Sequence, residues 1–232
     1  MVRYSHALVP GLLAASILTA ADPLPARGPG ADIVLDWLKF GNERHAAGKP
    51  VNWHQSVERR KEVAQRPAPG AVIVSCSDSR VPPEIVFDQG YGDLHVVRVD
   101  GNVVGEKELG SIEYAVEHLH TPLIVVMGHR HCGVVEAAVR GTPVRGHIAS
   151  LLASLSAAVS RSRGLPGDPI DNAARANVNH QVREIQQSEP MLGQMVGMGR
   201  VKVVAAFYDP ATGVVEWQPA AGAATRLLRS GM

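Results

Sequence analysis

The sequence contains only two cysteines, Cys76 and Cys132. Two thiols are too few for a disulfide framework, and their wide separation fits neither a short zinc-finger pattern nor a Cys-x-x-Cys redox pair. Three interpretations stay open on this evidence. The cysteines are metal ligands, they form one disulfide, or they are two small buried residues.

The chain also lacks an excess of charge of one sign, because 23 Lys and Arg balance 22 Asp and Glu to a net charge of +1. This balance gives no general attraction to nucleic acid or to an anionic membrane, so we expect no nucleic-acid partner. Internal repeats and low-complexity tracts are absent from residue 31 onward. With 45% hydrophobic residues the chain can bury one substantial core, and we expect residues 31–232 to form a single domain.

An apolar run long enough for a membrane span is missing as well. The apolar run at 7–21 is shorter than the roughly 20 residues that a span needs, and Pro10 and Gly11 interrupt it. One basic residue before the run and a Pro- and Gly-rich stretch after it resemble a secretory leader. The alternative is an N-terminal helix that packs on the body or on a second subunit. We therefore expect residues 1–30 to be a leader or N-terminal extension, with a periplasmic or secreted location if the leader is real and a cytoplasmic location otherwise.

Strands and helices alternate along the rest of the chain, as apolar β-branched runs and amphipathic stretches indicate. The predicted strands are 71–76, 93–99, 122–128 and 201–209 with a hairpin partner at 213–217, and the predicted helices are 31–48, 81–87, 106–120, 132–141, 145–162 and 170–187. In the first helix, the pattern places Ile33, Val34, Trp37, Leu38 and Phe40 on one side. The alternation predicts an α/β fold with a mainly parallel sheet flanked by helices.

Residues capable of chemistry follow two of the predicted strands. In VSCSDSR, Cys76, Asp78 and Arg80 stand at every second position after an apolar run, and an extended backbone would place their side chains on one side. In GHRHC, His129 and Cys132 follow the strand at 122–128. Because sites in parallel sheets gather beyond the carboxyl ends of the strands, we expect the two segments to meet.

Two thiolates and one imidazole form a ligand set that zinc prefers. We therefore expect Zn²⁺ to bind Cys76, His129 and Cys132. His129 is preferred to His131, because His131 is adjacent to Cys132 in the sequence whereas His129 is three residues away.

Three protein ligands leave a fourth position for water or an acidic side chain, and Asp78 is the nearest candidate. Arg80 can instead hold Asp78 in a fixed fork, which stabilises the charged carboxylate and keeps it from binding the metal permanently. The metal is then free to bind water.

Several longer segments add a further level of evidence. The central segments are CSDSRVPPEIVFDQGYGDLHVVR, GNVVG, SIEYAVEHL and VVMGHRHCG, and around them lie GNERHAAGK, GHIASLLASL, ARANVNHQV and FYDPATGVVEW. What matters is the order and spacing of these segments. In this they resemble the β-class carbonic anhydrases over essentially residues 31–218. The resemblance implies the fold of that family and a zinc enzyme that interconverts carbon dioxide and water with bicarbonate and a proton. It also implies a homodimer or higher homo-oligomer with a cleft at the subunit boundary.

The resemblance implies a role for each motif residue. Zinc is held by Cys76, His129 and Cys132, and a zinc-bound hydroxide attacks carbon dioxide. Asp78 and Arg80 are the catalytic pair. In a closed form Asp78 becomes the fourth metal ligand, and in the open form it pairs with Arg80.

Other positions match the family less closely. Gly133 is expected to position the loop at the metal, and Gln65 is the best match to a substrate-orienting glutamine, although two extra residues separate it from the first cysteine. Asp100 stands where the family usually has a small residue, and Arg130 stands where it often has serine. Asp100 therefore adds a negative charge near the cleft.

Two alternative functions fit the same residues. A hydrolase of carbonyl sulfide or carbon disulfide would need the same metal site, and hydration assays with each gas separate the two. A non-catalytic zinc-binding or thiol-redox module would instead have a disulfide between the cysteines or an Asp78 that closes the metal at every pH.

Overall fold

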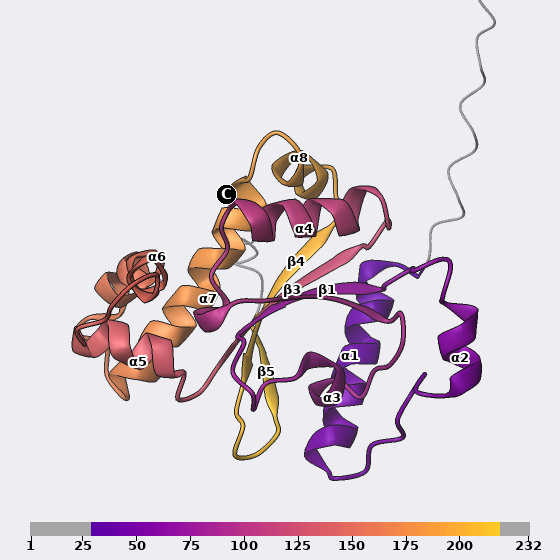
Figure 1. Ribbon diagram of the computed structural model, residues 1–232, viewed down its shortest axis with the longest axis horizontal. Coiled ribbons are helices and arrows are strands. Elements are labelled where there is room, and N and C mark those ends of the chain that lie inside the picture. The colour runs from indigo at the N-terminus through magenta and orange to yellow at the C-terminus, as the bar shows by residue number, and fades with distance from the viewer. Residues whose placement is uncertain (1–28, 219–232) are drawn as a thin grey trace, which may run out of the picture.

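The computed structural model of the protein describes residues 29–218 (Figure 1). The leader or extension expected at residues 1–30 lies almost entirely outside this range, so it stays a prediction, as does the location that depends on it. Within the described range, no helix combines the length and the apolar character that a membrane crossing requires.

Five strands form one sheet in the order β2-β1-β3-β4-β5. The first four run parallel, and β5 pairs antiparallel with β4 as the predicted hairpin. The strands are β1 (Ala71–Ser75), β2 (Leu94–Arg98), β3 (Leu123–His129), β4 (Lys202–Tyr208) and β5 (Val215–Gln218). The α/β fold with a mainly parallel sheet is thus confirmed. Because Ser75 pairs with Met127, the carboxyl ends of β1 and β3 lie side by side.

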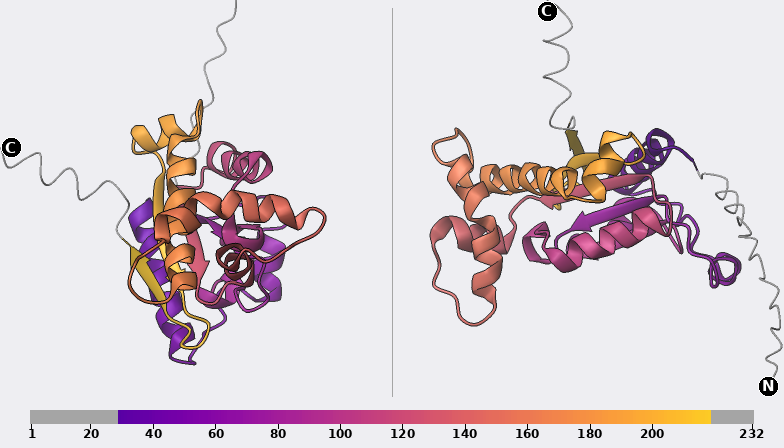
Figure 2. Two further views of the ribbon diagram at one scale, coloured as in Figure 1. Left: turned by 90° about the vertical axis from the view of Figure 1, so that its left-hand side faces the viewer. Right: turned by 90° about the horizontal axis from the view of Figure 1, so that it is seen from above.

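Helices cover both faces of the sheet (Figures 1 and 2). They are α1 (Ala31–Ala46), α2 (Val57–Glu62), α3 (Pro83–Val86), α4 (Glu106–Glu117), α5 (Gly133–Arg140), α6 (Ile148–Ser162), α7 (Pro169–Gln187) and α8 (Leu192–Gly197), with a short 3₁₀ turn, η1, at Asp100–Asn102. α4, α7 and α8 lie on one face and α1 and α3 on the other, while α5 and α6 lie beyond one end of the sheet (Figure 1). The sequence patterns did not predict the six-residue helices α2 and α8.

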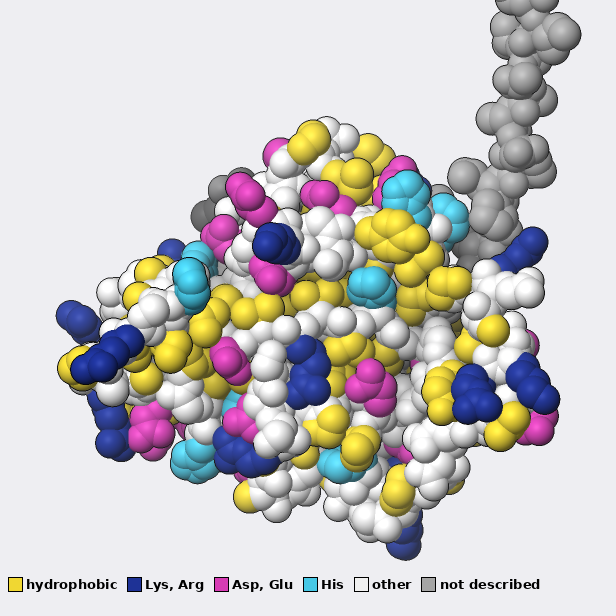
Figure 3. All heavy atoms as spheres, viewed as in Figure 1, with side chains coloured by type: hydrophobic (Ala, Val, Ile, Leu, Met, Phe, Trp, Pro, Cys, Tyr) yellow, Lys and Arg dark blue, Asp and Glu magenta, His cyan; other side chains and the backbone are white. Residues whose placement is uncertain are grey.

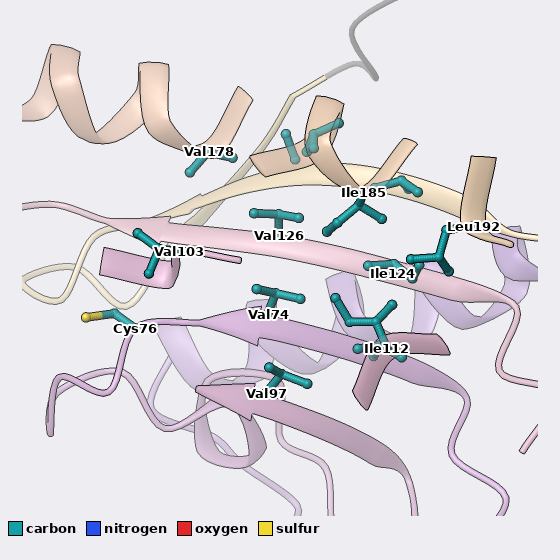
Figure 4. Packing of buried hydrophobic residues seen from close by; sticks show 14 of the residues in the cluster. Val74, Cys76, Val97, Val103, Ile112, Ile124, Val126, Val178, Ile185 and Leu192 are labelled. Carbon is teal, nitrogen blue, oxygen red and sulfur yellow. The ribbon is translucent and has the colours of Figure 1, made fainter. Parts of the chain in front are cut away.

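The core consists of two hydrophobic clusters, one on each face of the sheet. On the face shown in Figure 4, Val74 and Val126 of neighbouring strands pack with Ile112 of α4 and Val178 of α7. The approach of α7 depends on Gly128 in β3, because a Cβ atom there would lie 2.5 Å from the Val178 side chain. β1 and β3 are buried along their whole length, as expected for strands covered on both faces.

The buried face of α1 differs from the predicted one. Val34 and Leu38 are buried as expected, but Ile33 and Trp37 are about half exposed, at 52% and 50%. The helix instead turns Gly41 inward, where a Cβ atom would lie 1.8 Å from the carbonyl oxygen of Phe87. Close backbone packing, which hydrophobicity does not reveal, therefore sets the rotation of this helix.

Asn42 follows Gly41 on the same buried face. Its side-chain amide donates to the carbonyl oxygens of Val86 and Gly213, and its oxygen accepts from the backbone N–H of Val215. Asn42 is therefore a polar residue in the buried face of α1, and both the nitrogen and the oxygen of its side-chain amide are hydrogen-bonded, as buried polar atoms require.

Charged side chains of both signs are interspersed on the face shown in Figure 3. Lysine, arginine, aspartate and glutamate alternate there with apolar and neutral patches, and no single sign covers this face. This distribution agrees with the balanced composition of the chain.

We expect Asp88→Asn to destabilise the fold in a pH-dependent way. The buried Asp88 carboxylate accepts from Arg44 Nε at 2.6 Å and from the backbone N–H groups of Val51 and Asn52 at 3.1 and 2.9 Å. Burial alone would raise the pKa of this carboxyl, yet the guanidinium and the two amides hold it below its ordinary value. Loss of charge-assisted hydrogen bonds should lower the free energy of unfolding by about 2 kcal/mol at pH 7.

The pH dependence follows from the depressed pKa. The stabilisation is fully present above the ordinary carboxyl pKa of 3.8 and is lost as the pH falls through the lower folded-state value. Urea titrations of the wild type and the variant should therefore converge on acidification. The exposed Asp36, paired with Lys39 on the surface of α1, supplies the control, and Asp36→Asn should change stability by less than about 0.5 kcal/mol. A constant difference for Asp88→Asn down to pH 3 would contradict this assignment.

Candidate metal centre

Three side chains meet at the carboxyl ends of β1 and β3. Cys76 directly follows β1, with its sulfur pointing beyond the strand end and away from the packed side chains (Figure 4). His129 is the last residue of β3, and Cys132 is the N-cap of α5. One potential ligand atom of each residue lies within 4.8 Å of the others, and all three residues are buried. The adjacency of β1 and β3 therefore brings together segments that are distant in the chain, as predicted.

The separations within this cluster suit a single metal ion. The two sulfurs are 3.9 Å apart, close to the separation of about 3.8 Å expected for two Zn–S bonds of about 2.3 Å at a tetrahedral angle. A disulfide would need about 2.05 Å, and both cysteines are free. Of the three interpretations of the cysteines, the geometry therefore favours metal ligands.

The orientation of His129 also favours a metal site. A backbone carbonyl can only accept, so the 3.0 Å contact between Nδ1 and the carbonyl oxygen of Arg130 places the proton on Nδ1. Nε2 then carries a lone pair, and this buried atom has no hydrogen-bond partner. A buried nitrogen that faces two thiols without a partner calls for an explanation, and a metal ion supplies one. His131 is exposed and is not part of the cluster.

The protein stabilises negative charge on Cys76. The pKa of this thiol is lowered to about 4, chiefly by its hydrogen bond with Cys132, with further contributions from His129 and from the backbone N–H groups of Asp78 and Gly101. Burial opposes this shift. The pKa of Cys132 is raised, because this buried thiol shares its proton with the neighbouring sulfur. Without a cation the pair thus holds one proton, which a dication would displace on binding both sulfurs.

Asp78 lies beside the cluster and is held by Arg80. The guanidinium donates from Nε to Oδ1 at 3.0 Å and from Nη2 to Oδ2 at 2.7 Å. This fork is the main reason that the pKa of Asp78 is lowered to about 2. Asp78 Oδ2 is 4.0 Å from His129 Nε2, so the carboxylate is next to the ligands while it is bound to Arg80.

The backbone of this segment is not extended as the alternating pattern suggested. β1 ends at Ser75, and a turn follows in which the backbone N–H of Arg80 donates to Asp78 Oδ1 at 2.9 Å. A second bond, from the N–H of Val81 to the carbonyl oxygen of Asp78 at 3.0 Å, closes the turn. Asp78 and Arg80 therefore meet because the chain folds back, as is common for aspartate in turns.

Arg98 is a site residue that the sequence reasoning missed. It ends β2, and its guanidinium donates from Nε to the carbonyl oxygen of Cys76 at 3.0 Å and from Nη2 to that of Asp78 at 2.7 Å. Two carbonyls of the turn are thereby paired. The signal in the sequence was an arginine at the end of a predicted strand, but nothing there indicated its partners.

A chain of buried amides supports Cys76 from α7. Gln181 donates to Asn177 at 2.9 Å, and Asn177 donates to the carbonyl oxygen of Gly101 in η1 at 2.6 Å. The N–H of Gly101 in turn donates to the Cys76 sulfur at 3.2 Å. Gly101 adopts φ 71°, a conformation that glycine reaches without strain. The position of Cys76, one of the proposed ligands, thus depends on two residues of α7 that are far from it in the sequence.

The remaining predicted residues are placed differently. Gly133 opens α5 beside Cys132, with open space where a Cβ atom would be. Asp100 Oδ1 is 4.0 Å from the Cys76 sulfur, and burial, together with the charges of Cys76 and Asp78, raises its pKa.

Gln65 is not brought to the metal centre within the chain. It is exposed and lines a cavity of about 920 Å³ together with Gly70, Leu94 and Pro122. These three residues mark the amino ends of β1, β2 and β3, whereas the cysteines and His129 lie at the carboxyl ends. Gln65 therefore lies near the amino ends of these strands, on the other side of the sheet's length from the cysteines and His129.

Comparisons with known proteins give the same picture. The family described as "Carbonic anhydrase" matches residues 71–215. A carbonic anhydrase of Mycolicibacterium smegmatis is 38% identical over 194 residues, which cover 81% of this chain and 94% of the relative. A β-carbonic anhydrase structure from Aspergillus fumigatus has a TM-score of 0.65 and 25% identity, covering 85% of this chain and 95% of that one. One of two tetrameric β-carbonic anhydrases from Sordaria macrospora has a TM-score of 0.64 and 23% identity, covering 80% and 96%.

The matched segment contains every residue of the metal centre, from Cys76 to Cys132, and the fold around it is that of the solved structures. The sequence identity extends over 81% of the chain. This chain belongs to the β-class carbonic anhydrases, enzymes that interconvert carbon dioxide and bicarbonate.

Proposed function

We propose that this chain catalyses the zinc-dependent, reversible hydration of carbon dioxide, with Zn²⁺ held by Cys76, His129 and Cys132. The observation that carries the proposal is the buried, unpartnered Nε2 of His129 facing two free thiols. Two sulfurs and one nitrogen form the donor set that zinc prefers, and three ligands leave one coordination position open.

When bound in such a site, zinc acts as a Lewis acid that lowers the pKa of a coordinated water to about 7. The residues of the chain keep the fourth position open and orient the reacting water. Arg80 holds the Asp78 carboxylate ionised and engaged in the fork. Asp78 Oδ2 then accepts a hydrogen bond from the reacting water, which fixes the direction of its attacking lone pair.

The same carboxylate gives the site a second state. Asp78 Oδ2 needs to move only a short distance, since it lies 4.0 Å from the His129 nitrogen that faces the metal position. If its fork with Arg80 opened, Asp78 would be able to serve as the fourth ligand of a bound metal in place of water. We propose this closed form as the inactive state of the enzyme.

The proposed assembly is a homodimer or higher homo-oligomer. Two observations support it. Large apolar side chains on α1, Ile33, Trp37 and Phe40, are 50–57% exposed, which is a typical feature of surfaces that bind another protein. The structurally similar proteins of Sordaria macrospora are described as tetrameric.

The two alternative functions receive no support. The family match favours a carbonic anhydrase over a carbonyl sulfide or carbon disulfide hydrolase. A thiol-redox module would have a disulfide, but both cysteines are free. A permanently closed zinc module would have Asp78 on the metal, whereas the Asp78 carboxylate is paired with Arg80.

Metal analysis paired with stopped-flow hydration tests the proposal. We expect about one zinc per chain, hydration activity that rises with pH, and loss of activity on removal of zinc by a chelator with recovery on its return. Carbonyl sulfide and carbon disulfide serve as comparison substrates, and light scattering on the same preparation gives the assembly size. Full activity in a metal-free preparation would refute the proposal.

A further inference from the structure

The carbonyl oxygen of Arg130 fixes the orientation of His129. It accepts the Nδ1 proton at 3.0 Å and so turns Nε2 toward the two sulfurs. Groups that orient a metal-binding histidine in this way typically change metal affinity by 10–100-fold when they are removed. Whatever holds this carbonyl in place therefore contributes to the metal site.

The backbone at this point adopts a conformation that needs support. His131 has φ 54°, in the left-handed region that residues other than glycine rarely occupy. Two hydrogen bonds hold the segment from either side. The backbone N–H of Arg130 donates to the carbonyl oxygen of Tyr208 at 2.9 Å, and Arg80 Nη2 donates to that of His131 at 3.0 Å.

The side chain of Arg130 adds a third attachment. Its Nη1 donates to Asp171 in the first turn of α7, and its Nε lies 3.4 Å from Asp209 Oδ2, just after β4. Only 9% of the Asp171 side chain is exposed, and its second oxygen is buried without a partner. A buried carboxylate requires a paired cation, so Asp171 and Arg130 hold each other in place.

We propose that Arg130 is a positioning residue for the metal site. Its side-chain ion pairs with Asp171 and Asp209 fix the position of its own backbone carbonyl, which accepts the Nδ1 proton of His129. The inference rests on the zinc site proposed above. Arg130 is not a ligand, and its charge is offset by two carboxylates, so geometry and not electrostatic attraction or repulsion is its contribution.

The geometric role and a purely electrostatic one predict opposite effects of removing Arg130. If Arg130 acted through its charge alone, its removal would strengthen zinc binding, because a cation repels a dication, and removal of the Asp171 charge would weaken it. If Arg130 positions the carbonyl, Arg130→Met and Asp171→Asn both weaken zinc binding. In that case the double variant is little worse than either single variant, because both remove the same attachment.

The experiment measures zinc affinity by competition with a chromophoric chelator, and the absorption spectrum of the cobalt-loaded protein, for the full chain. We expect the zinc dissociation constant to rise 10–100-fold for Arg130→Met and for Asp171→Asn, with a changed cobalt spectrum, and partial recovery for Arg130→Lys. Arg140→Met is the matched control, since it removes an arginine from an exposed pair with Glu136 on α5 and should leave affinity within about twofold.

The outcomes separate this inference from the proposed function. If the wild type binds no zinc, the proposed function fails and the inference with it. If the wild type binds zinc and Arg130→Met binds it equally well, or more tightly, the inference alone is wrong. Circular dichroism of the metal-free proteins establishes that the variants fold. Should Arg130→Met not fold, Asp209→Asn removes only the longer contact and must still raise the dissociation constant several-fold more than the control does.

Discussion

Replacing His129 by alanine should abolish zinc binding and carbon dioxide hydration together. The substitution removes the only nitrogen donor of the cluster and leaves two thiols. A metal site contributes several kcal/mol of charge stabilisation to such reactions, so we expect hydration to fall by about 10³-fold or more. Zinc content of the purified variant and stopped-flow hydration measure the two losses.

His131→Ala is the matched control, because it removes an imidazole from the same loop. His131 is exposed and outside the cluster, so this variant should keep its zinc and hydrate carbon dioxide within a few-fold of the wild type. Zinc at full stoichiometry in His129→Ala, or its loss in His131→Ala, would show that the ligand assignment is wrong.

The sequence predicted those residues of the candidate metal centre that directly follow or end a buried parallel strand. Cys76 and His129 each stand at the end of a continuous apolar run, and such runs form the buried strands β1 and β3. Once two strands are parallel neighbours, the residues that follow them must lie close together. This is why segments far apart in the sequence could be assigned to one site.

The parts that the sequence did not predict depend on contacts between polar groups. The turn after β1 is fixed by the carboxylate of Asp78, and its carbonyls are paired with Arg98. Asn177 and Gln181 are buried on α7 in a helix whose sequence is mostly polar. Periodicity detects apolar faces, so buried amides and arginines with specific partners do not register in it.

The rotation of α1 illustrates the same limit for packing. Gly41 and Asn42 make the closest contacts with the body of the protein, although neither is hydrophobic. Ile33 and Trp37 are hydrophobic and half exposed. Hydrophobicity therefore predicted that a helix forms here, but the close approach of backbones decided which side faces inward.

Asp78→Asn should retain zinc but lose most of its turnover. Asparagine is nearly the same size as aspartate but carries no charge, so it accepts a hydrogen bond from the reacting water less strongly and no longer forms an ion pair with Arg80. None of the three proposed ligands changes. We expect zinc stoichiometry to stay near one per chain while kcat falls about 10²–10³-fold, the usual effect of losing a group that handles a proton in the reaction.

Arg80→Met should lower turnover by a different route. It leaves Asp78 charged but removes both bonds of the fork and the bond from Arg80 Nη2 to the carbonyl oxygen of His131. The carboxylate, 4.0 Å from His129 Nε2, is then free to occupy the fourth position. We therefore expect slower release of zinc to a chelator together with reduced hydration, and partial retention of activity in Arg80→Lys, which keeps the charge but not the planar fork.

The double variant Asp78→Asn/Arg80→Met separates the two effects. If Arg80 acts by restraining Asp78, then removing the carboxylate also removes the reason for the slow zinc release. The double variant should therefore release zinc at least as fast as Asp78→Asn, since it also lacks the bond to the His131 carbonyl. Its kcat should match that of Asp78→Asn, because the water has lost its charged acceptor in both. A kcat in Asp78→Asn equal to that of the wild type would show that Asp78 does not orient the water. Zinc release in the double variant as slow as in Arg80→Met would show that Asp78 does not compete with water for the metal.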